Sequence, residues 1–444
     1  MLARWGHAVR LITRPASSRG LAVSLPPSCG KLFDAIGISD LIERTGFLRS
    51  SGNTVWWGND QPRVEHFARG ALGWQVDVDA LANVMLTAAI DGGVVVERAT
   101  IATPEFGRDA IVLDCTGRAG IVARAKKLRA LVDGPRTIAL VGIWWHEGGW
   151  PVPDDSHTLV ESYADGWMWS VPTAPGLRHI AAMVDPQRSD LARDSSSDDV
   201  YRAEIAKTSV FKGLTAGASM IEGPRGFDAS PYRATAYAGD RWLLVGDAGS
   251  FIDPLSSAGV KKALASAWLA AVAVNTALTT PAMRATAFDF FSGREAEIER
   301  DMTRQGRQFL AGAAAAHPRP FWDERSDERF DEEDDIEQVR NALGRLRQQT
   351  LWQPRVGPSI RIEPRPIVRG NQVALEPHLV TAEYPRGIRY LRGVDVVALV
   401  QLAPSVLQVP DLYENYARTA GSVPLPDFLF ALATAVARRW LVAE

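Results

Sequence analysis

One segment dominates the sequence: Gly246-Asp247-Ala248-Gly249-Ser250-Phe251-Ile252-Asp253-Pro254-Leu255-Ser256-Ser257-Ala258-Gly259. The apolar residues 242–245 before it predict a buried strand, and the Ala-rich residues after it predict a helical region over about 260–315. A strand that leads through Gly-Asp into a loop and then a helix is typical of the ligand-binding edge of a doubly wound sheet. The free amides at the start of such a helix favour an electron-rich ligand.

The remainder of the first 320 residues predicts a parallel sheet that an antiparallel sheet interrupts. Residues 8–12 and 111–113 are strand-like, and Asp114 ends the second run much as Asp247 follows the strand at 242–245. Three later runs alternate as antiparallel strands around the hairpin signal Asp165-Gly166: residues 157–163, 167–171 and 178–184. We therefore expect an α/β fold, with a Rossmann-like parallel sheet and an inserted antiparallel sheet.

The last part of the chain predicts a second domain. Residues 323–340 are acidic and polar, which is typical of a solvated linker or an exposed helix. A hairpin and three short helices are expected after it, at 362–376, 394–402, 410–418 and 425–438. The expected division is 1–320 with an insert at about 50–75 and 135–230, a linker at 321–345, and a winged-helix-like domain at 346–444. This tail could recognise a protein or peptide, or could serve packing alone.

Composition limits the function classes. The 444 residues carry a formal net charge of −3, which argues against nucleic-acid binding and against a polybasic membrane contact. Two distant cysteines, Cys29 and Cys115, offer neither a disulfide framework nor a metal set and fit a reducing cytoplasm. The most apolar run, 263–278, is too short and too Ala-rich for a membrane span and predicts a buried helix. The 14 tryptophans, several of them in pairs, could fill a core or line an aromatic pocket.

The dominant segment resembles the second FAD motif of flavoprotein hydroxylases with the p-hydroxybenzoate hydroxylase fold, and most of all that of flavin-dependent tryptophan halogenases. Four other segments agree with this resemblance in order: Leu25-Pro26-Pro27-Ser28, Gly73-Trp74-Gln75-Val76-Asp77, Asp114-Cys115-Thr116-Gly117-Arg118-Ala119-Gly120 and Gly166-Trp167-Met168-Trp169-Ser170-Val171-Pro172. The resemblance spans roughly residues 1–310. The resemblance implies an FAD-dependent oxidoreductase that receives electrons from NAD(P)H or from a separate flavin reductase.

The cofactor residues follow from this resemblance. Asp247 would accept hydrogen bonds from a ribityl hydroxyl, and the helix start after Ala258 would face the part of the flavin that becomes negative on reduction. Pro254 would stiffen the turn, and Gly259 would let the backbone approach the ring. The full expected set is Thr13, Arg14, Gln75, Thr116, Gly117, Gly246, Asp247, Pro254, Ser257, Ala258 and Gly259.

Several positions depart from the family pattern. The Gly-x-Gly-x-x-Gly loop that holds the FAD pyrophosphate is absent, although residues 2–6 resemble the end of the helix that follows it. This pattern predicts a misplaced start codon or a truncated gene. Thr13 stands where an acidic residue usually binds the adenosine ribose, Val23 where a Glu is expected, and Val78 where an Arg is expected.

The halogenation chemistry of the family needs a lysine and a glutamate. The expected glutamate position is Ser256 here, and residues 53–58 contain no lysine. The sequence therefore favours hydroxylation of an aromatic ring through a flavin C4a-hydroperoxide, which demands less of the protein. His146 and Glu161 are the candidate bases, although each could instead be structural.

The substrate expected from the tryptophans is an indole, either free or carried on a peptide. Only one member of each adjacent pair can face a given side, so we expect Trp56, Trp145 and Trp169 to line the site. Two alternatives remain open. One is a flavin-dependent tryptophan halogenase, and the other is a degenerate protein that binds a partner without FAD.

Overall fold

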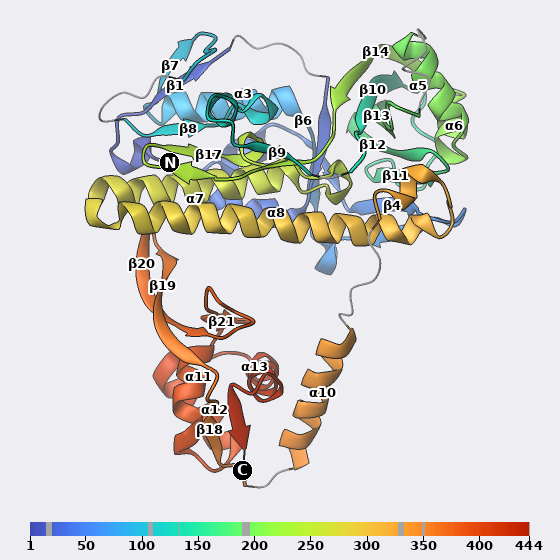
Figure 1. The fold of residues 1–444 in the computed structure, drawn as a ribbon. Coiled ribbons are helices and arrows are strands. Elements are labelled where there is room, and N and C mark those ends of the chain that lie inside the picture. Colours follow the sequence, from blue (N-terminus) through green and yellow to red (C-terminus); the bar gives the residue numbers. More distant parts are fainter. Residues whose placement is uncertain are drawn as a thin grey trace. The chain divides into compact units, whose positions relative to one another are not determined.

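The computed structural model describes residues 1–14, 20–104, 110–132, 134–188, 196–326, 333–348 and 351–443. The chain divides into two compact units, Met1–Glu328 and Arg329–Glu444. Each unit is described by itself. The first is a mixed α/β structure and the second is mainly helical, so the expected fold class is confirmed (Figure 1).

Outside the seven-stranded sheet, the parallel strands of the first unit form two separate ladders. β1 (Arg10–Thr13) pairs with β7 (Val95–Arg98), and β8 (Val112–Asp114) pairs with β17 (Trp242–Leu244), both in parallel. The short β16 (Ala238–Gly239) adds to β17 in the antiparallel sense. The sequence led us to expect one continuous parallel sheet, but the described residues contain no ladder that joins β1 to β8.

A small antiparallel sheet supports the parallel strands. It consists of β2 (Ala22–Leu25), β6 (Gly73–Asp77) and β3 (Leu48–Ser50). The side chain of Asp77 accepts hydrogen bonds from the amides of Asp79 and Ala80, and this cap starts the helix directly after β6. The helices beside these strands are α1 (Gly30–Ile36), α2 (Ser39–Arg44), α3 (Val78–Asp91) and α4 (Ile121–Ala125).

A seven-stranded sheet forms the other half of the first unit. Its order is β14-β10-β13-β12-β11-β4-β5, with the bounds Ser219–Asp228, Ile138–Trp145, Leu177–Val184, Gly166–Ala174, Thr158–Tyr163, Gly52–Trp56 and Arg63–His66. All neighbours are antiparallel except β11 and β4, which pair in parallel. The helices α5 (Ser197–Ala206) and α6 (Val210–Thr215) pack on one face. A further pair, β9 (Arg129–Leu131) with β15 (Tyr232–Ala234), lies outside this sheet.

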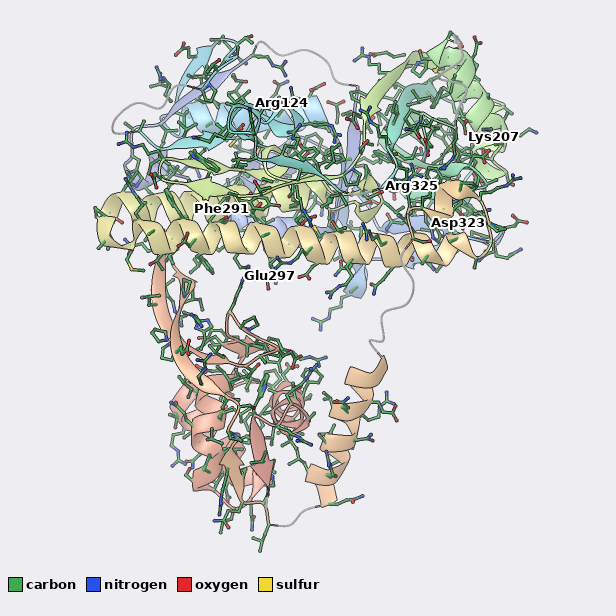
Figure 2. All side chains as sticks on the ribbon, in the orientation of Figure 1. Arg124, Lys207, Phe291, Glu297, Asp323 and Arg325 are labelled. Carbon is green, nitrogen blue, oxygen red and sulfur yellow. The ribbon has the colours of Figure 1, made fainter. Side chains whose placement is uncertain are left out.

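Two long helices underlie the strands, as Figure 1 shows in yellow. The helical region expected over 260–315 is two helices, α7 (Gly259–Thr279) and α8 (Arg284–Ala314), because Pro281 opens a separate turn between them. α7 is long and apolar enough to resemble a membrane span, but two thirds of its apolar window is buried in this unit, as expected for a core helix. Phe291 of α8 is fully buried in the same core (Figure 2).

The short helix α9 (Pro320–Asp323) closes the first unit beside the inserted sheet. Arg325, just after it, donates hydrogen bonds to the carbonyl of Arg136 at 2.8 Å and to the hydroxyl of Thr137 at 3.3 Å. It also lies 3.5 Å from the carboxylate of Asp185. Figure 2 shows Arg325 and Lys207 at this end of the unit. These contacts anchor the bend after α8 to residues 136–137, directly before β10, and to Asp185, directly after β13.

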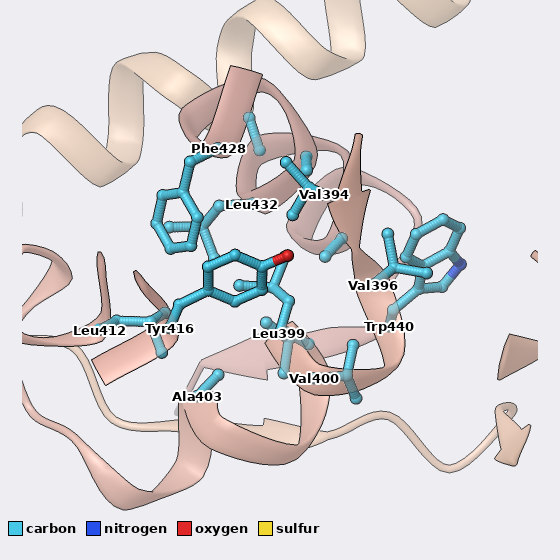
Figure 3. Close-up of a cluster of buried hydrophobic side chains, with 14 of the residues drawn as sticks. Val394, Val396, Leu399, Val400, Ala403, Leu412, Tyr416, Phe428, Leu432 and Trp440 are labelled. Atoms are coloured by element: carbon cyan, nitrogen blue, oxygen red, sulfur yellow. The ribbon is translucent and has the colours of Figure 1, made fainter. Parts of the chain in front are cut away.

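The second unit has its own core. Its helices are α10 (Glu333–Gln348), α11 (Val396–Leu402), α12 (Val409–Ala420) and α13 (Leu425–Ala437), and its strands are β18 (Pro354–Val356), β19 (Arg361–Arg369), β20 (Gln372–Val380), β21 (Tyr390–Leu391), β22 (Val394–Asp395) and β23 (Leu441–Ala443). The side chains of Tyr416, Phe428 and Trp440 are buried in one cluster with aliphatic residues (Figure 3). Part of the acidic segment expected as a linker or an exposed helix is thus helical, while residues 327–332 lie outside the described part.

Candidate functional site

The loop of residues 246–259 starts with a close approach between strand and helix. Gly246 follows β17 with φ of 61°, a left-handed conformation that favours glycine. A Cβ at this position would lie 3.0 Å from the Cβ of Ala263 on α7. The amide of Gly246 donates to the hydroxyl of Ser266 at 2.9 Å, so the loop is tied to α7 at its first residue.

The second half of the loop leads into α7 through a tight turn. The carboxylate of Asp253 accepts the amide of Leu255 at 2.9 Å, and Pro254 occupies the first position of this turn. Ser257 has φ of 47° and redirects the chain, so that α7 begins at Gly259. The first amides of a helix have no partner inside the helix. A Cβ built on Gly259 meets nothing within 4 Å, so this helix start borders open space.

The turn after β8 lies beside this loop. Asp114 accepts the amide and the hydroxyl of Thr116, at 3.1 and 2.6 Å, and the amide of Val122 at 2.8 Å. Its backbone carbonyl accepts the amide of Val245. Gly117 has φ of 61° and also borders open space. Two segments that the sequence assigned to one cofactor are therefore neighbours in the structure.

Charge is concentrated under the loop. Lys262 of α7 is 2% exposed, and its ammonium donates to the carbonyl of Ser250 at 2.5 Å and lies 3.7 Å from the carboxylate of Asp247. Burial raises the pKa of Asp247, whereas the cations of Lys262 and Arg118 lower it. Tyr232 donates its hydroxyl to the carbonyl of Asp247. The loop is thus held by side chains from behind as well as by its own backbone.

The aromatic face of the seven-stranded sheet meets the loop. We use this name for the face that carries Trp167 and Trp169 of β12. Phe251 and Leu255 of the loop pack against the same buried cluster as Trp169. The indole nitrogen of Trp169 is buried and has no hydrogen-bond partner among the described residues. Trp57 belongs to this face too, since its ring lies 4.8 Å from that of Phe309.

The opposite face of this sheet, which we call the helical face, holds two of the predicted site residues. Glu161 of β11 is 4% exposed. Its carboxylate accepts the amides of Ser209, Val210 and Phe211 at 2.7 to 3.1 Å, and these residues open α6. Trp56 pairs with Glu161 across the ladder and packs on the same face. The structure therefore does not bring Glu161 or Trp56 to the loop, and the described hydrogen bonds of Glu161 anchor the start of α6.

His146 and Trp145 lie at the end of β10. Trp145 is 45% exposed, and it pairs with Leu177 and Ser219 at the strand ends. The ring nitrogen Nδ1 of His146 contacts the carbonyl of Glu147 at 2.9 Å. Neither residue packs in the cluster that contains Trp169, so of the three predicted substrate residues the structure brings only Trp169 to the loop.

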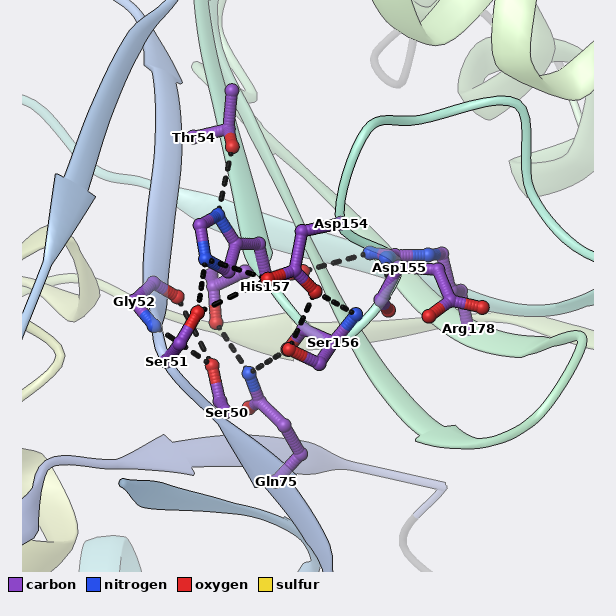
Figure 4. Close-up of polar contacts among 11 residues, drawn as sticks. Ser50, Ser51, Gly52, Thr54, Gln75, Asp154, Asp155, Ser156, His157 and Arg178 are labelled. Carbon is purple, nitrogen blue, oxygen red and sulfur yellow. Dashed lines mark hydrogen bonds and ion pairs between the residues drawn. The ribbon is translucent and has the colours of Figure 1, made fainter. Parts of the chain in front are cut away.

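Gln75 joins the small sheet to the seven-stranded one. Its amide nitrogen donates to the carbonyl of Ser156 at 2.9 Å and to the hydroxyl of Thr158 at 3.1 Å (Figure 4). His157 lies between these two residues in the chain. It contacts Ser51 and Thr54 through its two ring nitrogens, at 2.7 and 3.0 Å. This network fixes the sheets to each other.

The remaining predicted cofactor residues lie at the end of β1. The hydroxyl of Thr13 contacts the carbonyl of Arg14 at 3.4 Å, and that carbonyl also accepts a hydrogen bond from Arg98 at 3.2 Å. The described contacts do not connect Thr13 or Arg14 with the 246–259 loop. These two residues stay a prediction for the adenosine end of a cofactor.

The residues present fit one end of a flavin. Open space at Gly117 and Gly259, the uncapped amides of α7 and the ring of Trp169 suit an isoalloxazine and its ribityl chain. The glycine loop that would hold a pyrophosphate is not part of the sequence. The fit therefore covers the flavin end and leaves the adenosine end to Thr13 and Arg14.

Comparison with known proteins gives relatives among the halogenases. The chain is 26% identical over 320 residues to a tryptophan 2-halogenase of Chondromyces crocatus, which covers 66% of this chain and 61% of that protein. The chain is a relative of the flavin-dependent halogenases. One such halogenase, from Metacordyceps chlamydosporia, is 28% identical over 177 residues and 38% of this chain. The chain spans only 61% and 34% of the lengths of these two relatives, and no family model matches it.

Solved structures of halogenase relatives share the fold. The flavin-dependent halogenase CmlS superposes with a TM-score of 0.81 at 19% identity, covering 100% of this chain and 92% of CmlS. The peptidyl tryptophan dihydroxylase QhpG superposes with a TM-score of 0.65 at 21% identity, covering 95% of each chain. At these identities the superpositions show a shared fold, and together with the sequence relatives they confirm the resemblance to the tryptophan halogenase-like family.

Sequence reasoning missed some residues of this halogenase-like site. Trp57, and not Trp56, faces the aromatic side, because Val55 pairs with Val160 and so sets the parity of the strand. Lys262 was passed over as part of an apolar helix. A lysine inside an Ala-rich, buried run was the available signal, since lysine is rarely buried without a partner.

Proposed function

We propose that the chain is an FAD-dependent enzyme that halogenates an electron-rich aromatic ring, with an indole as the preferred class of substrate. The observation that supports this most is the packing of Phe251 and Leu255, from the 246–259 loop, against the same cluster as Trp169. A flavin at this loop and a ring on the aromatic face would be close neighbours. The relationship to a tryptophan 2-halogenase favours halogenation over other oxidations.

The residues of the chain would bind, orient and exclude water. When bound, reduced flavin supplies the two electrons with which O₂ converts a halide ion into an electrophilic halogen, which then replaces a ring hydrogen. The amides at the start of α7 would face the electron-rich edge of the flavin. Trp169 would stack against the substrate ring, and Phe251 and Leu255 would keep water from the reacting atoms.

Hydroxylation is the second candidate, and one observation favours it. Ser256 stands where halogenases carry a glutamate, and residues 53–58 offer no lysine. QhpG, a dihydroxylase of peptide-borne tryptophan, shares the fold over 95% of this chain. We therefore propose two substrate classes: a free indole and a tryptophan within a peptide. A separate reductase or NAD(P)H would supply the electrons.

The test supplies everything that either reaction needs. The purified chain is loaded with FAD and its visible spectrum recorded, and it is then given NADH, a general flavin reductase, air and free tryptophan, with and without bromide. A product that carries bromine in place of hydrogen supports halogenation. A product that gains oxygen in both arms supports hydroxylation instead. Bound flavin with neither product from tryptophan or from a tryptophan peptide would contradict the proposed function.

A further inference from the structure

The aromatic face carries a second polar ring beside Trp169 that the proposed reaction does not use. His179 of β13 is 4% exposed. Along its strand it has the same parity as Ala181 and Met183, which belong to the buried cluster of this face, so its side chain is on the same side of the sheet. The indole nitrogen of Trp169 is buried here without a partner among the described residues. Two polar rings therefore share one apolar surface.

The strand register makes these two rings neighbours. Trp169 of β12 pairs with Ala181 of β13, and Val171 pairs with His179. Trp169 and His179 thus stand at opposite corners of a set of four side chains, with their Cβ atoms roughly 7 Å apart, a separation that aromatic side chains can bridge. The other two corners hold Val171 and Ala181, which are small, apolar and buried. No large side chain of these two strands therefore separates the indole from the imidazole.

The hydrogen bond that His179 makes sets the chemistry of its second ring nitrogen. Its Nδ1 lies 3.2 Å from the backbone carbonyl of Gly20, and because a carbonyl can only accept, Nδ1 carries the hydrogen. Burial lowers the pKa of His179, although the Gly20 carbonyl and the carboxylates of Asp77 and Glu222 act in the opposite direction. The ring is therefore neutral at neutral pH and its Nε2 is an acceptor. The hydrogen bonds among the described residues give this Nε2 no donor.

Trp169 and His179 together offer one donor and one acceptor. An indole N–H can only donate, whereas the Nε2 of this histidine can only accept. A ligand that satisfies both must therefore accept from one ring and donate to the other. A hydroxyl does this with a single oxygen atom, whereas an amide needs two atoms for the same task. A carboxylate or an ether oxygen cannot do it, because neither has a hydrogen to donate.

We propose that Trp169 and His179 form a subsite for a hydroxyl group on the ring of the substrate, so that a hydroxylated indole is preferred over an unsubstituted one. The inference rests on the proposed function, which it deepens by naming the substituent that the site selects. The subsite also suits the chemistry. A ring hydroxyl that donates to Nε2 gains negative charge on its oxygen, which makes the ring more reactive toward an electrophile.

The test compares three ligands that differ in one substituent. The FAD-loaded chain is titrated without reductant with 5-hydroxyindole, 5-methoxyindole and indole, and binding is followed by calorimetry. The hydroxyl donates and accepts, the methoxy oxygen only accepts, and indole has neither group at this carbon. 5-Hydroxyindole should bind about tenfold more tightly than 5-methoxyindole, because the loss of one hydrogen bond changes affinity by about this factor.

Two substitutions of His179 separate the roles of its nitrogens. His179→Asn keeps a donor for the Gly20 carbonyl but loses the acceptor at Nε2, so it should bind the hydroxyl and methoxy ligands equally. His179→Gln retains an acceptor oxygen near Nε2 and should keep part of the preference. Trp169→Phe should weaken both oxygen-bearing ligands about tenfold and affect indole much less. His146→Asn, a matched change outside the cluster, should leave all three affinities unchanged.

Each outcome supports or overturns the subsite. Equal binding of the hydroxyl and methoxy ligands by the wild type, or a His179→Asn chain that keeps the preference, would overturn it. If Trp169→Phe changes the affinity for FAD and not that for the two ligands, the indole N–H faces the cofactor and the donor half is wrong. If His179→Asn loses cooperative thermal unfolding, the ligand series on the wild type and on His179→Gln decides.

The proposed function and the subsite can fail separately. A chain that prefers 5-hydroxyindole but forms no halogenated or oxygenated product refutes the proposed function and leaves the subsite standing. A chain that converts tryptophan but does not distinguish the hydroxyl from the methoxy ligand refutes the subsite alone. If the chain does not retain FAD, the same titrations on the flavin-free chain decide about the subsite.

Discussion

The helical and aromatic faces of the seven-stranded sheet are built from the same strands, and each carries a tryptophan whose indole N–H is buried: Trp144 on the helical face and Trp169 on the aromatic face. On the helical face, Tyr201 accepts the indole N–H of Trp144 at 3.0 Å and donates to the carbonyl of Ile180 at 2.9 Å. On the aromatic face, the indole N–H of Trp169 is buried without a partner among the described residues. Because an unpaired buried donor costs stability, we take the indole N–H of Trp169 as a candidate ligand contact, whereas Tyr201 and Trp144 complete each other within the fold.

The largest effect should come from removing the helix anchor on the helical face. Glu161→Ala leaves three amides at the start of α6 without their acceptor, which should destabilise the first unit by about 3–5 kcal/mol. Thermal unfolding followed by tryptophan fluorescence would measure this loss. Glu161→Gln keeps an acceptor oxygen and should lose much less. A stable Glu161→Ala chain that lacks activity would return Glu161 to the candidate bases.

A smaller loss is expected for the hydroxyl that joins two partners on the helical face. Tyr201→Phe strips a buried carbonyl and a buried indole N–H of their common partner and should cost about 2–3 kcal/mol. Urea unfolding at a fixed temperature would detect it. Aromatic oxidation should be unchanged below the melting temperature, and a selective loss of turnover would break the division between the faces.

The aromatic face should respond in the reverse sense. Trp169→Phe keeps a ring but removes the unpaired N–H, so stability should change by about 1 kcal/mol or less. Substrate affinity should fall about tenfold if the N–H binds the substrate. Loss of one hydrogen bond costs roughly 1.4 kcal/mol, which corresponds to a tenfold change in affinity. Titration of the flavin-loaded chain with an indole would measure the affinity. An unchanged affinity would show that the N–H does not contact the ligand.

The smallest effect is expected for His146. Its ring is partly buried, lies 5.5 Å from the ring of Trp150, and makes its described hydrogen bond to a neighbouring carbonyl. His146→Ala should therefore alter stability by about 1 kcal/mol or less and should leave the pH profile of turnover unchanged. Loss of the basic limb of that profile in the variant would make His146 the base after all.

Much of the fold could be predicted from the sequence, because strands, turns and helices are signalled by neighbouring residues. The segment 246–259, the strands around 111–113 and 242–245, and the alternating runs at 158–184 each carry their signal within a few residues. The face that a residue occupies is a different matter. Whether Trp56 or Trp57 points to the loop depends on the register of β4 against β11, which lies about a hundred residues away.

The candidate site could be predicted only in part, because some of its contacts join residues that are distant in the sequence. The loop and the turn at Thr116-Gly117 were identified from motif and resemblance, and the structure brings them together. Glu161 was chosen as a base because a carboxylate on a strand is chemically suitable. Its capture by α6 depends on where residues 209–211 dock, and no spacing within the sequence encodes that. The contacts of Lys262 with Ser250 and Asp247 form only when α7 packs under the loop, and residue spacing alone does not encode them.

The route of the chain through the seven-stranded sheet has a consequence for the order of folding. The central strands β10, β13, β12 and β11 are close in sequence, but β4 beside them comes far earlier, with Thr54 and His157 in contact across 103 residues. Closing a loop of that length costs about 4 kcal/mol of chain entropy. We therefore expect the hairpins of the centre to form first and the segment that carries Trp57 to dock late. On this expectation Trp57 stays in water until the last step of assembly, and a change in its fluorescence would report that step.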